Sequence, residues 1–142
     1  MSGDVKLTST PSSAVVFFNK ALAIDFEYRC KQAGQLASKM RFLTAPWISM
    51  LESGTWLRNA IRANSRARQL ASRLEAADGL EILFPVEANA VFLQASASTF
   101  EALRARGWRF YTFIGGGARF MFSWDSCPNR VDELAKDILR LA

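Results

Sequence analysis

The residues from Trp108 to Asp125, WRFYTFIGGGARFMFSWD, constrain the fold more strongly than any other stretch of the chain. Two apolar, strand-like runs flank three consecutive glycines, Gly115, Gly116 and Gly117. Glycine adopts positive φ values without a steric penalty, so glycines between two such runs are typical of a turn joining paired strands. The sequence therefore predicts a β-hairpin here, and a sheet to which the hairpin belongs.

The second strand of this hairpin carries an arginine whose position follows from the alternation of side chains. Successive residues of a strand point to opposite faces of the sheet. This alternation gives two sets, Phe120, Phe122 and Trp124 on the core face and Arg119, Met121 and Ser123 on the other. From there Arg119 is placed to hold a carboxylate by two charge-assisted hydrogen bonds. The alternative is an exposed strand arginine that faces water and keeps the sheet soluble.

The rest of the chain supplies the other elements of a small α+β domain. Helix-like and strand-like segments alternate around the hairpin. The expected helices cover residues 19–35, 39–49 with Pro46 as a kink or boundary, 54–76, 98–106 and 129–141, and the expected strands cover 14–18, 80–84 and 90–94. This order predicts a small, mostly antiparallel sheet with helices packed on one face, preceded by a helical segment.

The expected helix over residues 54–76 is amphipathic and carries a basic stripe. At about 100° per residue, its apolar residues share one side and several arginines share the opposite side. The apolar set is Leu57, Ala60, Ile61, Ala63, Ala67, Leu70, Ala71 and Leu74, and the basic stripe is Arg58, Arg62, Arg66 and Arg73. A nucleic-acid or acidic-partner surface is one interpretation, but no aromatic residues interleave for base stacking, and a solvated helix face is the simpler one.

Composition narrows the possible chemistry. The chain has 142 residues, two cysteines and no histidine, which leaves no imidazole for a catalytic triad or a metal site. Cys30 and Cys127 form no metal-binding spacing, so no bound metal is expected. We expect both cysteines to be reduced thiols in a cytoplasmic protein. The longest apolar run, Ala14 to Phe18, is too short to span a bilayer. A net charge of +5 favours anionic partners without identifying one.

Longer segments of the chain resemble a known enzyme family. From Ala14 to Asp125 the chain is similar to the C-terminal part of the low-specificity L-threonine aldolases. The matching segments, in order, are AVVFFNKALAIDFEYRCKQAGQLASKMRFLTAPW, WLRNAIRAN, FPVEANAVFLQ, GWRFYTF and ARFMFSWD. The resemblance covers nearly all of this chain but less than half of a typical family member, whose large cofactor-binding domain would precede Met1.

The resemblance implies a fold, a domain organisation and a reaction. The fold would be the C-terminal small domain of a fold-type-I, pyridoxal-phosphate-dependent enzyme. Residues 1–18 would be a remnant of the large domain, residues 19–53 a helical connection and residues 54–142 the small domain. Family members are lyases that cleave L-threonine and other β-hydroxy-α-amino acids to glycine and an aldehyde, with pyridoxal 5'-phosphate as the electron sink.

The resemblance also assigns roles to four residues. Arg119 would bind the α-carboxylate of the amino-acid substrate. Lys39 and Arg41, in the segment ASKMRF, would lie near the cofactor phosphate, with solvated cations as the alternative. Lys6 falls at the spacing of the family's Schiff-base lysine, but Val5, Leu7 and Thr8 replace the expected neighbours.

Two functions follow from these observations. In the first, the chain is part of a threonine-aldolase-like lyase and is inactive alone, because most of the cofactor's binding groups would lie in the absent portion. In the second, it is a non-catalytic interaction module whose apolar strand at Val15 to Phe18 has an unpaired edge. Both predict association, either as a homo-oligomer or with a complementing chain.

Overall fold

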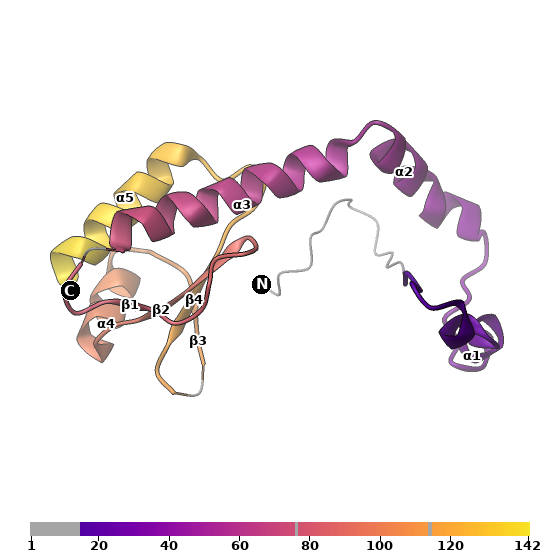
Figure 1. Cartoon of the computed structure of the whole chain (residues 1–142), viewed down its shortest axis with the longest axis horizontal. Helices are drawn as coiled ribbons and strands as arrows, with labels where there is room; N and C mark the ends of the chain where they lie inside the picture. The colour runs from indigo at the N-terminus through magenta and orange to yellow at the C-terminus, as the bar shows by residue number, and fades with distance from the viewer. Residues whose placement is uncertain (1–14, 76, 114) are drawn as a thin grey trace. The chain divides into compact units, whose positions relative to one another are not determined.

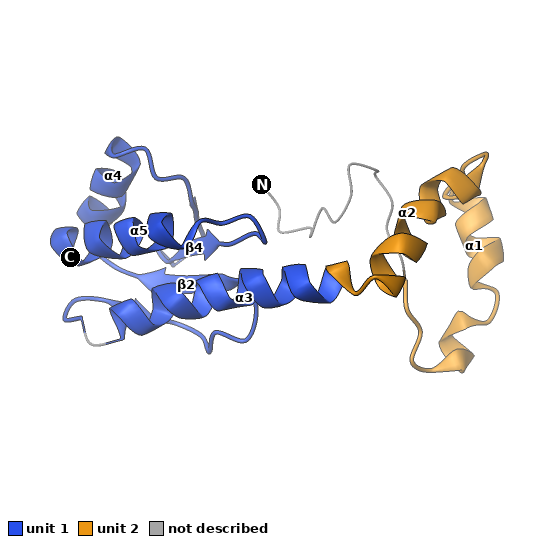
Figure 2. Cartoon of the chain, turned by 90° about the horizontal axis from the view of Figure 1, so that it is seen from above, with its two compact units in different colours: residues 1–5, 56–142 blue, residues 6–55 orange. Residues whose placement is uncertain are grey.

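The computed structural model describes residues 15–75, 77–113 and 115–142, which fall into two compact units. Of the described residues, those from 56 to 142 form one unit and those from 15 to 55 form the other (Figure 2). We refer to them as the sheet unit and the helical unit. Among the described residues, no helix is long and apolar enough to cross a membrane. The predicted cytoplasmic location and the predicted three-part division of the chain both stay predictions.

The sheet unit is built on a four-stranded antiparallel sheet with the strand order β1-β2-β4-β3 (Figure 1). Its strands are β1 (Glu81–Ile82), β2 (Ala90–Gln94), β3 (Tyr111–Thr112) and β4 (Ala118–Met121). Its helices are α3 (Thr55–Leu74), α4 (Ala97–Ala105) and α5 (Pro128–Leu141). The predicted α+β class, the antiparallel sheet and the hairpin are confirmed.

One face of the sheet forms the core with all three helices. Val91 and Leu93 of β2 and Ala118 and Phe120 of β4 are buried, whereas the residues between them on each strand are only partly buried. Side chains from α3, α4 and α5 belong to the same buried cluster, for example Leu70, Leu103 and Ile138. The helices therefore cover a single face, as predicted, and the opposite face carries the alternate residues of each strand.

The long helix α3 is only partly covered by this core. Its buried residues, Ala63, Ala67, Leu70, Ala71 and Leu74, all belong to the predicted apolar side. Leu57 and Ile61 lie on the same side but are about half exposed. The amphipathic pattern thus identified the correct face, and the first turns of α3 extend beyond the part that the sheet unit buries.

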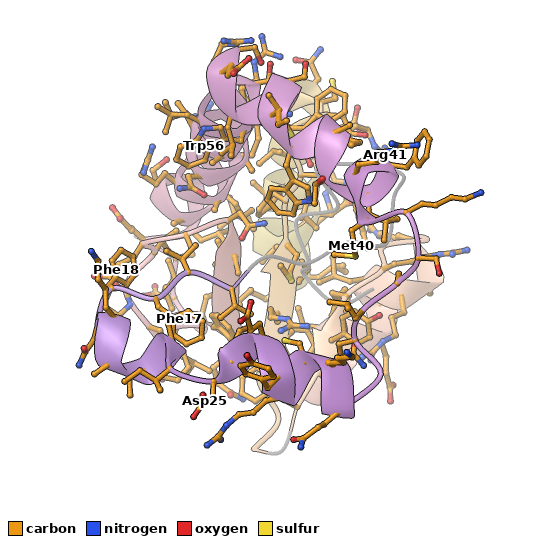
Figure 3. The ribbon with its side chains drawn as sticks, turned by 90° about the vertical axis from the view of Figure 1, so that its right-hand side faces the viewer. Phe17, Phe18, Asp25, Met40, Arg41 and Trp56 are labelled. Atoms are coloured by element: carbon orange, nitrogen blue, oxygen red, sulfur yellow. The ribbon has the colours of Figure 1, made fainter. Side chains whose placement is uncertain are left out.

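The helical unit buries very little. It contains the 3-10 helix η1 (Lys20–Ala23), α1 (Phe26–Gln32) and α2 (Met40–Glu52). Of the described residues 15–55, Met50 alone is buried. The Phe17 and Phe26 rings meet edge to face with centroids 4.8 Å apart, and Phe18 is 99% exposed (Figure 3). Packing within this unit therefore buries few of its apolar side chains.

Three local predictions from the sequence are wrong. Residues 15–18 form no strand, because no described strand pairs with them, and Val15 and Val16 are exposed. The single helix expected over residues 19–35 is divided into η1 and α1, with Asp25 in the left-handed region between them. Trp124 is about half exposed rather than in the core, because β4 ends at Met121 and the chain then turns. Each error concerns where an element stops or what covers it.

An acidic side chain links α5 to the segment that follows α4 and makes the sheet unit sensitive to acid. Asp137 accepts a hydrogen bond of 2.8 Å from the Trp108 indole nitrogen and also pairs with Arg106. The hydrogen bond from Trp108, and then the charge and hydrogen bond of Arg106, hold the pKa of Asp137 below its ordinary value of 3.8, against the opposing effect of partial burial. Deprotonated Asp137 is therefore favoured in the folded state.

We expect the folded state to lose the stabilisation from deprotonated Asp137 as the pH falls through the unfolded-state pKa of this residue and then through its lower folded-state pKa. A lowered folded-state pKa adds stability above both values, and protonation removes it. Urea unfolding at pH 6 and at pH 3 measures the change. Asp137→Asn should be less stable than the parent at pH 6 and should lose less on acidification. An unchanged pH dependence in Asp137→Asn would contradict this role.

Candidate functional site

The hairpin of β3 and β4 places Arg119 on the face of the sheet that the helices leave open. Tyr111 pairs with Arg119, and Thr112 pairs with Ala118. The loop closes with a hydrogen bond of 3.0 Å from the Phe113 amide to the Gly117 carbonyl. Since Ala118 and Phe120 are buried on the core face, Arg119 lies on the opposite face, as the alternation predicts.

Two aromatic residues flank Arg119 across the sheet. Phe92 of β2 and Tyr111 of β3 lie directly opposite Arg119 in the register, so all three side chains share the open face. The Arg119 guanidinium carbon lies 5.6 Å from the centroid of the Tyr111 ring, within the range of a cation–π contact. The ring and the rigid strand together limit the positions that this guanidinium can take.

The Nε atom of Arg119 is buried and has no hydrogen-bond partner among the described residues. Leaving a buried donor unpaired carries a desolvation cost of about 1–3 kcal/mol, and more for a charged group. Arg119 as a whole is partly buried and not fully enclosed. An arginine with an unpaired Nε can offer Nε and one terminal nitrogen to the two oxygens of a carboxylate.

Beside Arg119, the open face continues as an aromatic cluster. The Phe92 ring meets Phe84 edge to face at a centroid distance of 5.3 Å and meets Phe113 at 5.9 Å. Gly117 lies against this cluster, and a Cβ atom there would lie 2.6 Å from Cζ of Phe113 and 2.9 Å from Cδ1 of Leu83. Gly117 is thus needed for close packing, whereas Gly115 and Gly116 have positive φ values of 102° and 86°.

The site around Arg119 is an open surface and not a closed cavity. Tyr111 is 51% exposed and Phe113 is 40% exposed. A hollow of about 210 Å³ lies behind β4 against α5, and a wider one of about 650 Å³ lies between α3 and the segment 82–86, but Arg119 lines neither. A small molecule held by Arg119 would therefore be bound on one side only by the described residues.

Lys39 and Arg41 lie in the helical unit, at the start of α2. Lys39 is the residue before the first turn of α2 and has a positive φ of 60°, and its side chain is exposed and does not cap the helix. Arg41 is also exposed, and its guanidinium carbon lies 5.1 Å from the centroid of the Phe42 ring (Figure 3). These cations and Arg119 belong to different units.

The predicted Schiff-base lysine, Lys6, lies outside the described residues, so its role stays a prediction. The described residues contain no group of three or more Cys, Asp or Glu side chains that could hold a metal ion.

Part of the basic stripe of α3 has a structural role. Arg66 donates a hydrogen bond of 2.6 Å to the Gln69 side chain, whose amide nitrogen in turn lies 3.0 Å from Oδ1 of Asp132 on α5. Arg73 lies 3.3 Å from the same Asp132 oxygen. These contacts connect α3 to α5, which favours a structural interpretation for this half of the stripe. Nucleic-acid binding by the stripe is untested.

Sequence reasoning identified Arg119 but missed the residues around it. Tyr111, Phe92 and Phe113 become neighbours of Arg119 only through the strand pairing. A signal for Tyr111 was present, since Tyr111 and Arg119 are equally distant from Gly115, the first residue of the glycine run. A hairpin that turns at this glycine pairs the two residues. No comparable local signal identifies Phe92, which comes from a non-consecutive strand.

Comparison with known proteins supports the resemblance noted from the sequence. No protein-family model matches the chain. The low specificity L-threonine aldolase of a Pseudomonas species is 61% identical over 137 residues, which is 96% of this chain and 40% of that protein. The low specificity L-threonine aldolase of Pseudomonas aeruginosa matches with the same identity and coverage. The chain is therefore homologous to part of these proteins and spans about two fifths of their length.

Proposed function

We propose that this chain is the substrate-carboxylate-binding part of a lyase of the low-specificity L-threonine aldolase type. The observation that carries the proposal is Arg119, whose buried Nε lacks a partner while its guanidinium is held on the open face of the sheet. In a chain homologous to threonine aldolases, an amino-acid carboxylate is the acceptor that suits this donor. Arg119 would bind and orient the substrate by that carboxylate.

The described residues fit a pyridoxal 5'-phosphate site only in part. Lys39 and Arg41 are exposed cations beside the N-terminus of α2, where free backbone N–H groups also favour an anion, so they could hold the phosphate group. Lys39 and Arg41 line neither of the two hollows described above. These hollows therefore provide no surface beside Lys39 and Arg41 against which the cofactor ring could pack. We therefore propose that catalysis needs further polypeptide.

The proposal is tested by titrating the isotopically labelled chain with glycine, L-threonine and ethanolamine. Ethanolamine replaces the carboxylate of glycine with a hydroxymethyl group and keeps the amine, so it controls for the amine. We expect the two amino acids to shift the NMR signals of the Arg119 Nε–H and of the β3 and β4 amides, since the carboxylate supplies the missing acceptor. An Arg119 signal that stays in place, or that ethanolamine moves equally, would overturn the proposal.

A non-catalytic interaction module is the second candidate function. The observation that favours it is the large number of exposed apolar side chains in residues 15–61, including Phe18, Phe42 and Ile61. Surfaces of this kind commonly mark a site of association. In this alternative the chain associates in the same way, but Arg119 binds no amino acid, so the titration above separates the two functions.

A further inference from the structure

Helix α2 is apolar around its whole circumference. Among its residues, Arg41 and Glu52 are the charged ones, and they lie near its two ends. At about 100° per residue, Phe42, Ile48 and Met50 project in three well-separated directions. Met50 is buried, while Phe42 and Ile48 are 62% and 57% exposed. A helix that is apolar on every side is typical of the interior of a larger protein and not of a surface.

The remainder of the helical unit also exposes many apolar side chains. Between Val15 and Leu51, eleven large apolar side chains of the described residues are at least 40% exposed. With so little apolar area buried, the helical unit gains little to offset the conformational entropy lost when its backbone becomes ordered. Positive φ values at the non-glycine residues Asp25 and Lys39 add to that cost. The unit therefore needs an external surface to become ordered.

The comparison with the relatives indicates what supplies that surface. The match covers 96% of this chain, so nearly the whole helical unit is retained in proteins of which this chain spans only 40%. We propose that the helical unit docks on a polypeptide equivalent to the unmatched three fifths of the threonine aldolases, with Phe42 and Ile48 of α2 buried in the contact. This inference rests on the proposed function, in which the chain works as part of a larger assembly.

A second copy of this chain is a less suitable occupant. Each copy carries a net charge of +5, so two copies repel each other before any apolar contact is made. A second copy would also bring the same exposed apolar surface, and it would not supply the polypeptide that the match leaves out. Self-association through the helical unit is therefore an outcome that would overturn the proposal.

The experiment combines this chain with the part of the Pseudomonas aeruginosa relative that the match leaves out. The two polypeptides are co-expressed with a tag on this chain, and recovery of the complex and hydrogen exchange of residues 15–55 are measured. We expect a soluble one-to-one complex in which these amides exchange at least tenfold more slowly than in the chain alone. Failure to recover a complex, or a complex with unprotected amides in residues 15–55, overturns the proposal.

Matched variants locate the contact. The double variant Phe42→Ser/Ile48→Ser should weaken the complex at least tenfold, because it removes two exposed apolar side chains from α2. Leu139→Ser, at an exposed position of α5 in the sheet unit, should leave the complex unchanged. Equal effects of the two changes would contradict docking through α2.

Two further measurements test docking of the helical unit separately from carboxylate binding by Arg119. In the chain alone, residues 15–55 should exchange far faster than the sheet unit, whatever the behaviour of the second polypeptide. Strong protection of residues 15–55 in a monomer, or in a homodimer detected by sedimentation, overturns the proposal. Arg119→Gln should form the complex as well as the parent does, so loss of carboxylate binding and loss of docking are observed independently.

Discussion

Replacing Arg119 with glutamine is expected to reduce the affinity of the chain for glycine and L-threonine by at least tenfold. Glutamine is polar and fits a partly buried strand position, but it has no charge and no pair of parallel donors for a carboxylate. Hydrogen bonds to a charged group contribute about 1.5–3 kcal/mol, which corresponds to a factor of roughly ten or more. The amino-acid titration followed by NMR measures the difference directly.

Arg109→Gln is the matched control for this prediction. Arg109 is an exposed arginine two residues before Tyr111, so the same substitution there changes the net charge of the chain equally. We expect the affinity of Arg109→Gln to stay within about twofold of the parent, since surface charges act weakly at a distance in salt. If both variants lose affinity alike, binding depends on net charge and Arg119 has no specific role.

Replacing Leu103 with alanine is expected to destabilise the sheet unit by about 2–5 kcal/mol. Leu103 lies on α4, is fully buried and belongs to the cluster that joins the sheet to its three helices. The substitution removes buried methyl groups and leaves a cavity that the surrounding strands and helices can only partly fill. The urea midpoint measured by the circular dichroism of the whole chain reports the change.

Leu139→Ala provides the comparison for Leu103→Ala. Leu139 has the same side chain on a helix of the same unit but is 45% exposed. Its replacement should cost less than about 1 kcal/mol, because surface substitutions leave no cavity and alanine favours helix. A similar loss of stability in both variants would mean that the buried cluster does not control unfolding.

The elements that sequence analysis predicted well are those specified by local patterns. The predicted strand at residues 90–94 matches β2, because its apolar run is bounded by turn-forming residues on one side and a helix cap on the other. The glycine run gave the hairpin, and the helical period of residues 54–76 gave the buried side of α3. In each case the signal lies within a few residues of the element itself.

The failures occur where distant residues decide the outcome. The apolar run at Val15 and Val16 has the composition of a strand, yet a strand also needs a neighbour to accept its hydrogen bonds. The expected helix with Pro46 inside it is present as α2, so of the two alternatives at Pro46, a kink or a boundary, the boundary is excluded. For the candidate site, alternation was enough to place Arg119, whereas the approach of Phe92 depends on the pairing of β2 with β4.

The lengths of the two outermost strands limit association through the edges of the sheet. Both β1 and β3, which border the sheet, are only two residues long. Such short borders offer few free backbone groups on which a further chain could add by hydrogen bonding. The sheet is therefore a poor template for fibre growth, even though its open face carries several aromatic rings.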